Sequence, residues 1–272
     1  MKKSVVLFVV LLALVSVCCA FAADTVTVKV GASPSPHAEI LEALKPIVAE
    51  KGIDLEIVEF TDYVLPNTAL EDGSIDLNFF QHTPYLDDFN ANYKENNANW
   101  IDLVPLLQVH FEPMGIYGGK SSDLNNIPEG AKIAVPNDTT NEARALLLLE
   151  DLGIITVKEG VGLEATAKDI VDNPKNIELV EMEAAQLPRI LPDVDFAVIN
   201  GNYALDAGLT ADDMLASEST DSEAAKLYGN VIVAREDLAD TEAYQTIVEA
   251  IQCDEIRTFI EEKYNGAVVP MF

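Results

Sequence analysis

The sequence predicts an α/β fold built on a mostly parallel β-sheet. Short runs of β-branched and aromatic residues alternate with amphipathic helical segments along most of the chain, and this alternation is typical of βαβ units. The part that follows the apolar N-terminal run is about 250 residues long. That length is enough for one large domain or for two lobes with separate cores.

The predicted elements fall into two series. In the first series, strands cover residues 26–31, 54–60 and 75–80, and helices cover residues 38–51 and 66–72. In the second, strands cover residues 131–136, 177–182, 195–200 and 230–234, and helices cover residues 141–152, 186–191 and 241–264. Between the series, residues 111–119 mix a proline and three glycines with apolar side chains, as expected of a crossover between lobes.

The first 22 residues have the pattern of a secretory signal peptide. Two lysines precede an apolar run over residues 5–17, and the Ala-Phe-Ala sequence at residues 20–22 provides a cleavage site. The run is too short for a membrane span, so we expect an exported protein, periplasmic or at the cell surface. Cys18 and Cys19 are candidate lipidation sites, and a lipid on either would anchor the N-terminus to a membrane. Cleavage after residue 22 and lipidation of a cysteine are two open routes.

Charge and cysteine content exclude several classes of protein. The chain has 46 acidic residues against 17 basic ones and a formal net charge of −29. Such a surface repels nucleic acid and anionic lipid, so we expect neither as a partner. Either processing route leaves Cys253 alone, and we expect no intramolecular disulfide in the mature domain. The position of Cys253 in the last predicted helix indicates a small buried residue.

Two strand ends carry the residues that point to a ligand. Residues 78–86, Asn-Phe-Phe-Gln-His-Thr-Pro-Tyr-Leu, place aromatic rings and an imidazole after one strand. Residues 136–144 place small polar side chains and then Arg144 at the start of a helix. Sheets of this class bind ligands beyond the carboxyl ends of their strands. An apolar slot together with a carboxylate clamp suits a small amphiphilic amino acid. Since Phe79 and Phe80 alternate across the strand, we expect Phe79 in the core and Phe80 in the slot.

Catalysis and metal binding are not indicated. No nucleophile stands beside a base, and the sequence has neither a Gly-x-Ser-x-Gly elbow nor a phosphate-binding glycine loop. His37, His82 and His110 are the only histidines, and none is near another, or near a cysteine, at metal-ligand spacing. We therefore predict no metal site and no cofactor, and no role is assigned to His110.

Five segments, in order along the chain, carry a family resemblance: residues 31–40, 79–82, 135–144, 183–189 and 197–200. Together they resemble the methionine-binding lipoprotein family, the extracytoplasmic substrate-binding subunits of methionine ABC importers. The resemblance covers essentially the whole mature chain, but the residue before Cys18 is larger than a lipoprotein signal usually has.

The resemblance implies a two-lobed periplasmic binding-protein fold, type II-like, with the ligand cleft between the lobes. Lobe 1 would comprise residues 23–111 plus 230–272, and lobe 2 residues 112–229. It further implies a monomer that captures methionine and delivers it to an ABC permease in the membrane.

The family pattern maps onto six ligand-binding residues of this sequence: Tyr63, Phe80, His82, Arg144, Asn200 and Asn230. The forked guanidinium of Arg144 can hold an α-carboxylate through two parallel bonds. An asparagine amide offers an acceptor for an ammonium group and donors for a carboxylate. Aromatic rings such as Tyr63 and Phe80 can flank a thioether, a contact worth about 0.3–1.5 kcal/mol. His82 would close the slot or bond to the other lobe.

Structural alternatives exist for several of these residues. Arg144 could form a helix-surface ion pair with Glu142 or Glu150, and His82 could be a satisfied structural histidine. Asn200 and Asn202 could both be turn residues, with Asn202 the better helix cap.

Other functions also stay open. The same site would suit a methionine-containing dipeptide or another apolar amino acid. A cleft enzyme on the same scaffold and a surface adhesin are more remote alternatives. The sequence does not separate L- from D-methionine.

Overall fold

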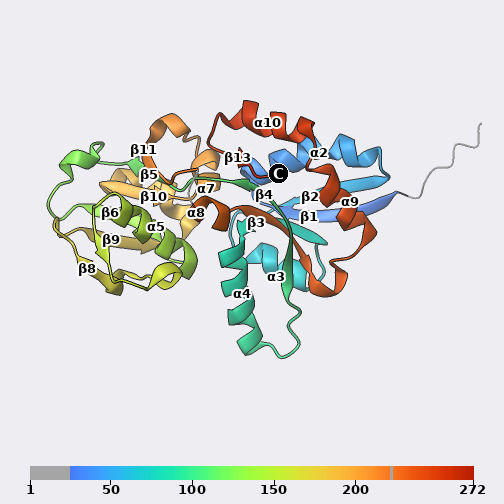
Figure 1. The fold of residues 1–272 in the computed structure, drawn as a ribbon, viewed down its shortest axis with the longest axis horizontal. Coiled ribbons are helices and arrows are strands. Elements are labelled where there is room, and N and C mark those ends of the chain that lie inside the picture. The colour runs from blue at the N-terminus through green and yellow to red at the C-terminus, as the bar shows by residue number, and fades with distance from the viewer. Residues whose placement is uncertain (1–24, 221–222) are drawn as a thin grey trace, which may run out of the picture.

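The structure, a computed structural model, describes residues 25–220 and 223–272. Its two main β-sheets lie in different halves of an elongated molecule (Figure 1), and the predicted α/β class is confirmed. The predicted signal peptide, Cys18 and Cys19 lie outside the described residues. Within the described part, no helix combines the length and the apolar character needed to cross a bilayer.

The first sheet has six strands in the order β13-β4-β12-β3-β1-β2. Their bounds are β1 Val26–Ala32, β2 Ile53–Glu59, β3 Leu77–His82, β4 Leu103–Phe111, β12 Asn230–Arg235 and β13 Val269–Pro270. Strand β1 pairs in parallel with β2 and β3. Strand β12 comes from late in the chain and runs antiparallel between β3 and β4. The sheet is therefore less parallel than the sequence predicts.

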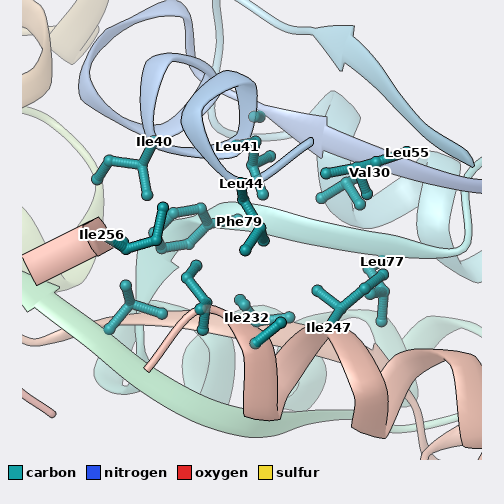
Figure 2. Packing of buried hydrophobic residues seen from close by; sticks show 14 of the residues in the cluster. Val30, Ile40, Leu41, Leu44, Leu55, Leu77, Phe79, Ile232, Ile247 and Ile256 are labelled. Carbon is teal, nitrogen blue, oxygen red and sulfur yellow. The ribbon is translucent and has the colours of Figure 1, made fainter. Parts of the chain in front are cut away.

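Helices cover both faces of this sheet. They are α2 Glu39–Ala49, α3 Leu65–Glu71, α4 Thr83–Asn96, α9 Glu242–Ala250 and α10 Asp254–Tyr264, with a short π-helical segment η1 Pro34–Ala38 before α2. Strand β12 shows why both faces are buried: Ile232 packs with the α2, α9 and α10 side, whereas Val231 packs with the α3 and α4 side. Figure 2 shows the first of these clusters, in which α2, β1, β3, β12 and α9 meet around Phe79. The prediction that Phe79 belongs to the core is confirmed.

The second sheet has five strands in the order β11-β5-β10-β6-β9. Their bounds are β5 Gly115–Gly118, β6 Lys132–Pro136, β9 Glu178–Met182, β10 Phe196–Ile199 and β11 Met214–Ser217. The helices of this half are α5 Thr139–Asp151, α6 Leu187–Ile190, α7 Gly201–Asp206 and α8 Glu223–Leu227. Alternate residues of β10 again face opposite clusters, because Phe196 packs with α5 and Ala197 packs with the α6 and α7 side.

Smaller elements complete the chain. A two-stranded sheet pairs β7 Thr156–Val157 with β8 Ile170–Asp172. The 3-10 segments are η2 Leu124–Asn126, η3 Gly162–Glu164, η4 Ala167–Asp169, η5 Ala184–Gln186, η6 Leu191–Asp193, η7 Ala211–Asp213 and η8 Glu236–Leu238.

The chain passes between the two sheets twice. It leaves the first sheet after β4 and enters the second at β5, and it returns between β11 and β12. We call the first sheet with its helices the first lobe and the second sheet with its helices the second lobe. The predicted lobe boundaries, residues 23–111 with 230–272 and residues 112–229, stay a prediction.

The structure corrects the predicted elements in the C-terminal segment and after β3. The single helix predicted over residues 241–264 is wrong, because α9 ends at Ala250 and α10 starts at Asp254. Cys253 is the extended N-cap residue of α10 and is half-buried rather than a core residue. Two acidic residues in the first turn of α10 favour a helix start there. Helix α4 and strand β4 were not predicted.

Candidate ligand-binding site

A small cavity lies where the carboxyl ends of β3, β6 and β10 approach one another. It is lined by Tyr63, Phe80, Gln81, His82, Tyr85, Glu112, Asn141, Arg144, Asn200, Gly201, Asn202 and Asn230. All six residues predicted to bind a ligand are among them. The structure brings them together from both lobes.

One side of the cavity is aromatic. Tyr63 lies before α3, Phe80 lies in β3 and Tyr85 lies in the first turns of α4. The ring centroids of Tyr63 are 5.9 Å from Phe80 and 5.7 Å from Tyr85. The Tyr85 hydroxyl donates to the Tyr63 carbonyl at 2.9 Å. This side therefore offers flat apolar surfaces whose polar tips are already satisfied.

His82 connects the two lobes. Its Nδ1 accepts the Tyr85 backbone N–H at 3.2 Å, which makes it the N-cap of α4. The proton is therefore on Nε2, which donates to Asn141 Oδ1 in α5 at 3.1 Å. Burial, reinforced by the nearby Arg144 charge, lowers the pKa of His82 to about 3, so the ring is neutral at pH 7.

Arg144 is buried and paired, but not as the surface alternative predicts. Its Nε and Nη2 donate to the two carboxylate oxygens of Glu218 at 2.7 and 2.6 Å, and Nη2 also donates to the Glu112 carbonyl at 2.9 Å. The partner is therefore Glu218, and not Glu142 or Glu150, whose carboxylates accept backbone N–H groups of Ala167 and Val157. Glu218 and the Glu112 carbonyl occupy Nε and Nη2 of the guanidinium. Nη1 is therefore the nitrogen that remains to donate to a ligand carboxylate.

Three asparagines line the cavity with Arg144, and each is hydrogen-bonded to another lining residue. Asn141 Oδ1 accepts from Asn200 Nδ2 at 2.8 Å as well as from His82. Asn202 Oδ1 accepts from the Tyr63 hydroxyl at 2.5 Å. Within residues 25–220 and 223–272, buried Asn200 Oδ1 and Asn202 Nδ2 have no hydrogen-bond partner. Buried polar atoms are normally satisfied, so this acceptor and this donor are free for a ligand.

The helix-cap prediction is wrong for Asn202. Asn200, rather than Asn202, occupies the N-cap position of α7, and its side chain makes no capping bond. Both side chains are instead bonded within the cavity wall.

Glu112 contributes a buried carboxylate from the crossover between β4 and β5. Burial raises its pKa, although His37 and Arg144 oppose the shift. Gly201 approaches Glu112 closely: a Cβ at position 201 would lie 2.7 Å from the Glu112 Cβ. Only glycine leaves room for this carboxylate against the start of α7.

Histidines that are distant in sequence meet behind this wall. Ligand atoms of His37, His110 and Glu112 all lie within 4.8 Å of one another, and all three residues are buried. Wide spacing along the chain was the reason to expect no metal site. Because the fold brings His37 and His110 together, that spacing does not exclude one. The absence of a metal stays a prediction that has to be judged from the geometry of the cluster.

Sequence reasoning missed Glu112, Asn141 and Asn202. Asn141 lies within the strand-end segment that was singled out, and an acidic residue within the apolar crossover was a signal for Glu112. Asn202 gave no signal that separates it from an ordinary helix cap.

A cavity of this kind between two α/β lobes defines a two-lobed binding protein. The chain belongs to the NlpA lipoprotein family, whose model matches residues 28–272. The resemblance found in the sequence is confirmed.

Solved and curated relatives support the same conclusion. A lipoprotein structure from Ruminococcus gnavus is 52% identical, with a TM-score of 0.87, over 90% of this chain and 99% of that one. A nutrient-binding protein from Burkholderia cenocepacia, solved bound to methionine, is 40% identical, with a TM-score of 0.83, over 90% of this chain and all (100%) of that one. D-methionine-binding lipoprotein MetQ of Salmonella typhimurium is 43% identical over 246 residues, 89% of this chain and 87% of that protein. The two-lobed fold is confirmed by these structures.

Proposed function

We propose that this protein is the substrate-binding subunit of a methionine ABC importer, and that it holds one free methionine in the cavity between its lobes. The observation that carries the proposal is the pairing of an aromatic wall with unpaired groups of opposite polarity. The methionine-bound relative and the D-methionine-binding relative support the choice of ligand.

The hydrogen-bond network sets the polarity of the wall. The amide nitrogen of Asn200 donates to Asn141, so its amide oxygen is left as an acceptor for a ligand. The amide oxygen of Asn202 accepts from Tyr63, so its amide nitrogen is left as a donor. Asn200 Oδ1 and the Glu112 carboxylate would accept from an α-ammonium group, whereas Asn202 Nδ2 and Arg144 Nη1 would donate to an α-carboxylate. Tyr63 and Phe80 would flank the thioether.

Catalysis is not part of the proposal. The strongest candidate base, His82, has both ring nitrogens engaged, with Tyr85 and with Asn141. A cavity wall in which polar groups are fixed by one another is suited to holding a ligand unchanged.

The test is calorimetric titration of protein that has been unfolded and refolded to remove bound ligand. We expect methionine to bind at one site per chain and to be recovered chemically unchanged. A heat of binding with a methionine-containing dipeptide but not with methionine would make the dipeptide the ligand in place of methionine. Turnover of either compound would make the protein an enzyme rather than a binding protein.

Closure of the lobes should accompany binding. Two hydrogen bonds between cavity-lining residues, Tyr63 with Asn202 and His82 with Asn141, join the first lobe to the second. The Ser35 N–H donates to Asp206 Oδ1 at 3.1 Å and adds a third link between the lobes. A ligand that contacts both lobes stabilises the closed form, because only differential contacts shift such an equilibrium. We expect a smaller radius of gyration with methionine than without it, measured by solution scattering. Identical curves would contradict closure.

Membrane delivery follows from the family. We propose that residues 1–22 direct export, that the protein is a monomer, and that its closed form docks on an ABC permease. Mass spectrometry of the mature N-terminus would separate lipidation of Cys18 or Cys19 from cleavage after Ala22.

A further inference from the structure

Two histidines lie behind the cavity, where β4, β12 and η1 meet. His110 is near the end of β4 and pairs across the sheet with Asn230, the first residue of β12. His37 lies in η1, and both histidines have no exposed surface. Their rings pack edge-on against Phe79, with centroids 4.7 and 5.2 Å away. The core residue Phe79 therefore limits where both imidazoles can point.

The hydrogen-bond partners of the two rings are acceptors. His110 Nε2 lies 2.7 Å from Glu112 Oε1. His37 Nε2 lies 3.0 Å from Asn230 Oδ1 and 3.4 Å from Glu112 Oε1. The Asn230 amide oxygen cannot donate, so His37 carries its proton on Nε2 and donates it, and His110 does the same toward the carboxylate form of Glu112.

The same geometry argues against a metal ion. Within the residues that the structure describes, both Nδ1 atoms are buried without a partner. A metal on the two Nε2 atoms would require protons on these Nδ1 atoms, leaving two buried N–H groups with no acceptor. Metal-bound histidines almost always donate that second N–H to a partner. Buried N–H groups without an acceptor are rarer in proteins than buried acceptors without a donor, so the arrangement favours unprotonated Nδ1 atoms.

The two donors set what the cavity presents. His110 binds Glu112 Oε1, and this bond stabilises the ionised carboxylate, which burial disfavours. His37 binds Asn230 Oδ1, so the side of the Asn230 amide left for a ligand is Nδ2, a donor. In this arrangement the Glu112 carboxylate is an acceptor and Asn230 is a donor in the same wall.

We propose that His37 and His110 are positioning residues: His110 makes the cavity selective for a ligand with a free ammonium group, and His37 orients the donor that meets its carboxylate. His110 holds Glu112 as the acceptor of that group, and His37 turns the Asn230 amide toward the ligand's carboxylate. The inference rests on the proposed function and deepens it, since neither histidine touches the ligand.

The experiment compares methionine with 4-(methylthio)butanoic acid, which keeps the thioether and carboxylate but lacks the amine. The variant His110→Phe keeps a ring and loses the donor, and His110→Gln keeps a donor. We expect His110→Phe to weaken methionine binding by about tenfold or more, the scale of a hydrogen bond to a charged group. Its affinity for the deaminated acid should not change, and His110→Gln should restore much of the methionine affinity.

Ile247→Val is the packing control, because it loosens the same core cluster from α9 and removes no donor. It should leave the ratio of the two affinities unchanged. Equal weakening of both ligands by His110→Phe would reduce His110 to a structural residue and overturn the proposal.

A second measurement needs no variant. Nitrogen-15 spectra of the histidine rings in ligand-free protein should show neutral Nε2–H tautomers for His37 and His110. Nδ1–H tautomers, or stoichiometric Zn²⁺ binding that removes the Nε2–H signals, would overturn the positioning role even in a protein that binds methionine. Failure of the wild type to bind methionine would instead overturn the proposed function and the selectivity that rests on it.

Discussion

Replacement of Arg144 by alanine is expected to damage both folding and binding. Glu218 would lose a two-bond partner in a site where the side chains of Arg144 and Glu218 are only 4% and 9% exposed. Removing one member of a buried pair typically costs about 3–5 kcal/mol of unfolding free energy. Methionine binding should weaken by about thirtyfold or more, because a charged contact in a desolvated site is lost. Urea unfolding and calorimetry would measure the two effects separately.

A double variant separates folding from binding. Arg144→Met with Glu218→Gln removes both charges and keeps an oxygen that can accept the Met114 backbone N–H, now bound by Glu218 at 2.8 Å. We expect much of the stability to return but not the affinity. Arg235→Ala is the control, since its exposed pair with Asp237 should contribute less than about 1 kcal/mol. Normal affinity in the double variant would contradict a ligand contact by Arg144.

Acid is expected to destabilise the protein below about pH 6.5. Burial lowers the pKa of His37 to about 4 and the pKa values of His82 and His110 to about 3. The unfolded chain binds protons on these rings from pH 6.5 downward while the folded chain does not, so stability is lost as pH falls from 6.5 toward 4. Each ring contributes at most roughly 1.4 kcal/mol per pH unit in that window. Asp206 acts in the opposite sense, because burial raises its pKa to about 6.

Urea unfolding from pH 7 to pH 4.5 would measure this slope. The variant His110→Gln should have a shallower slope than the wild type, because one buried titrating ring is removed. Equal slopes for the wild type and His110→Gln would show that the buried His110 ring is not held neutral.

Local sequence patterns predicted the strands and helices that alternate. The valines of β1 and the β-branched run of β12 gave clear signals, because such strands are buried on one or both faces. The antiparallel direction of β12 was not predictable in the same way, since pairing depends on contacts across more than 100 residues, such as Asn230 with His110. Helix α4 was missed because its exposed face is rich in asparagine and charged residues, which weakens the apolar period.

The site was predictable where a residue's chemistry is distinctive. Arg144 and Phe80 were found because a charge in a helix start and an aromatic ring at a strand end are unusual. The partner of Arg144 was not predicted, because Glu218 lies 74 residues away in the sequence and no local pattern joins the two residues. The same holds for His37 and His110, whose meeting depends on the three-dimensional packing around Phe79.

The place of β12 affects the order in which the molecule can assemble. The second sheet uses only strands between Gly115 and Ser217, whereas the first sheet has its centre filled by a strand that begins at Asn230. A chain that emerges N-terminus first would have β3 and β4 ready with a gap of one strand between them. The second lobe can therefore complete its sheet first, and the first lobe waits for the last 43 residues of the 272-residue chain. Because His82, His110 and Asn230 adjoin only once β12 is inserted, the binding cavity would be among the last parts to form.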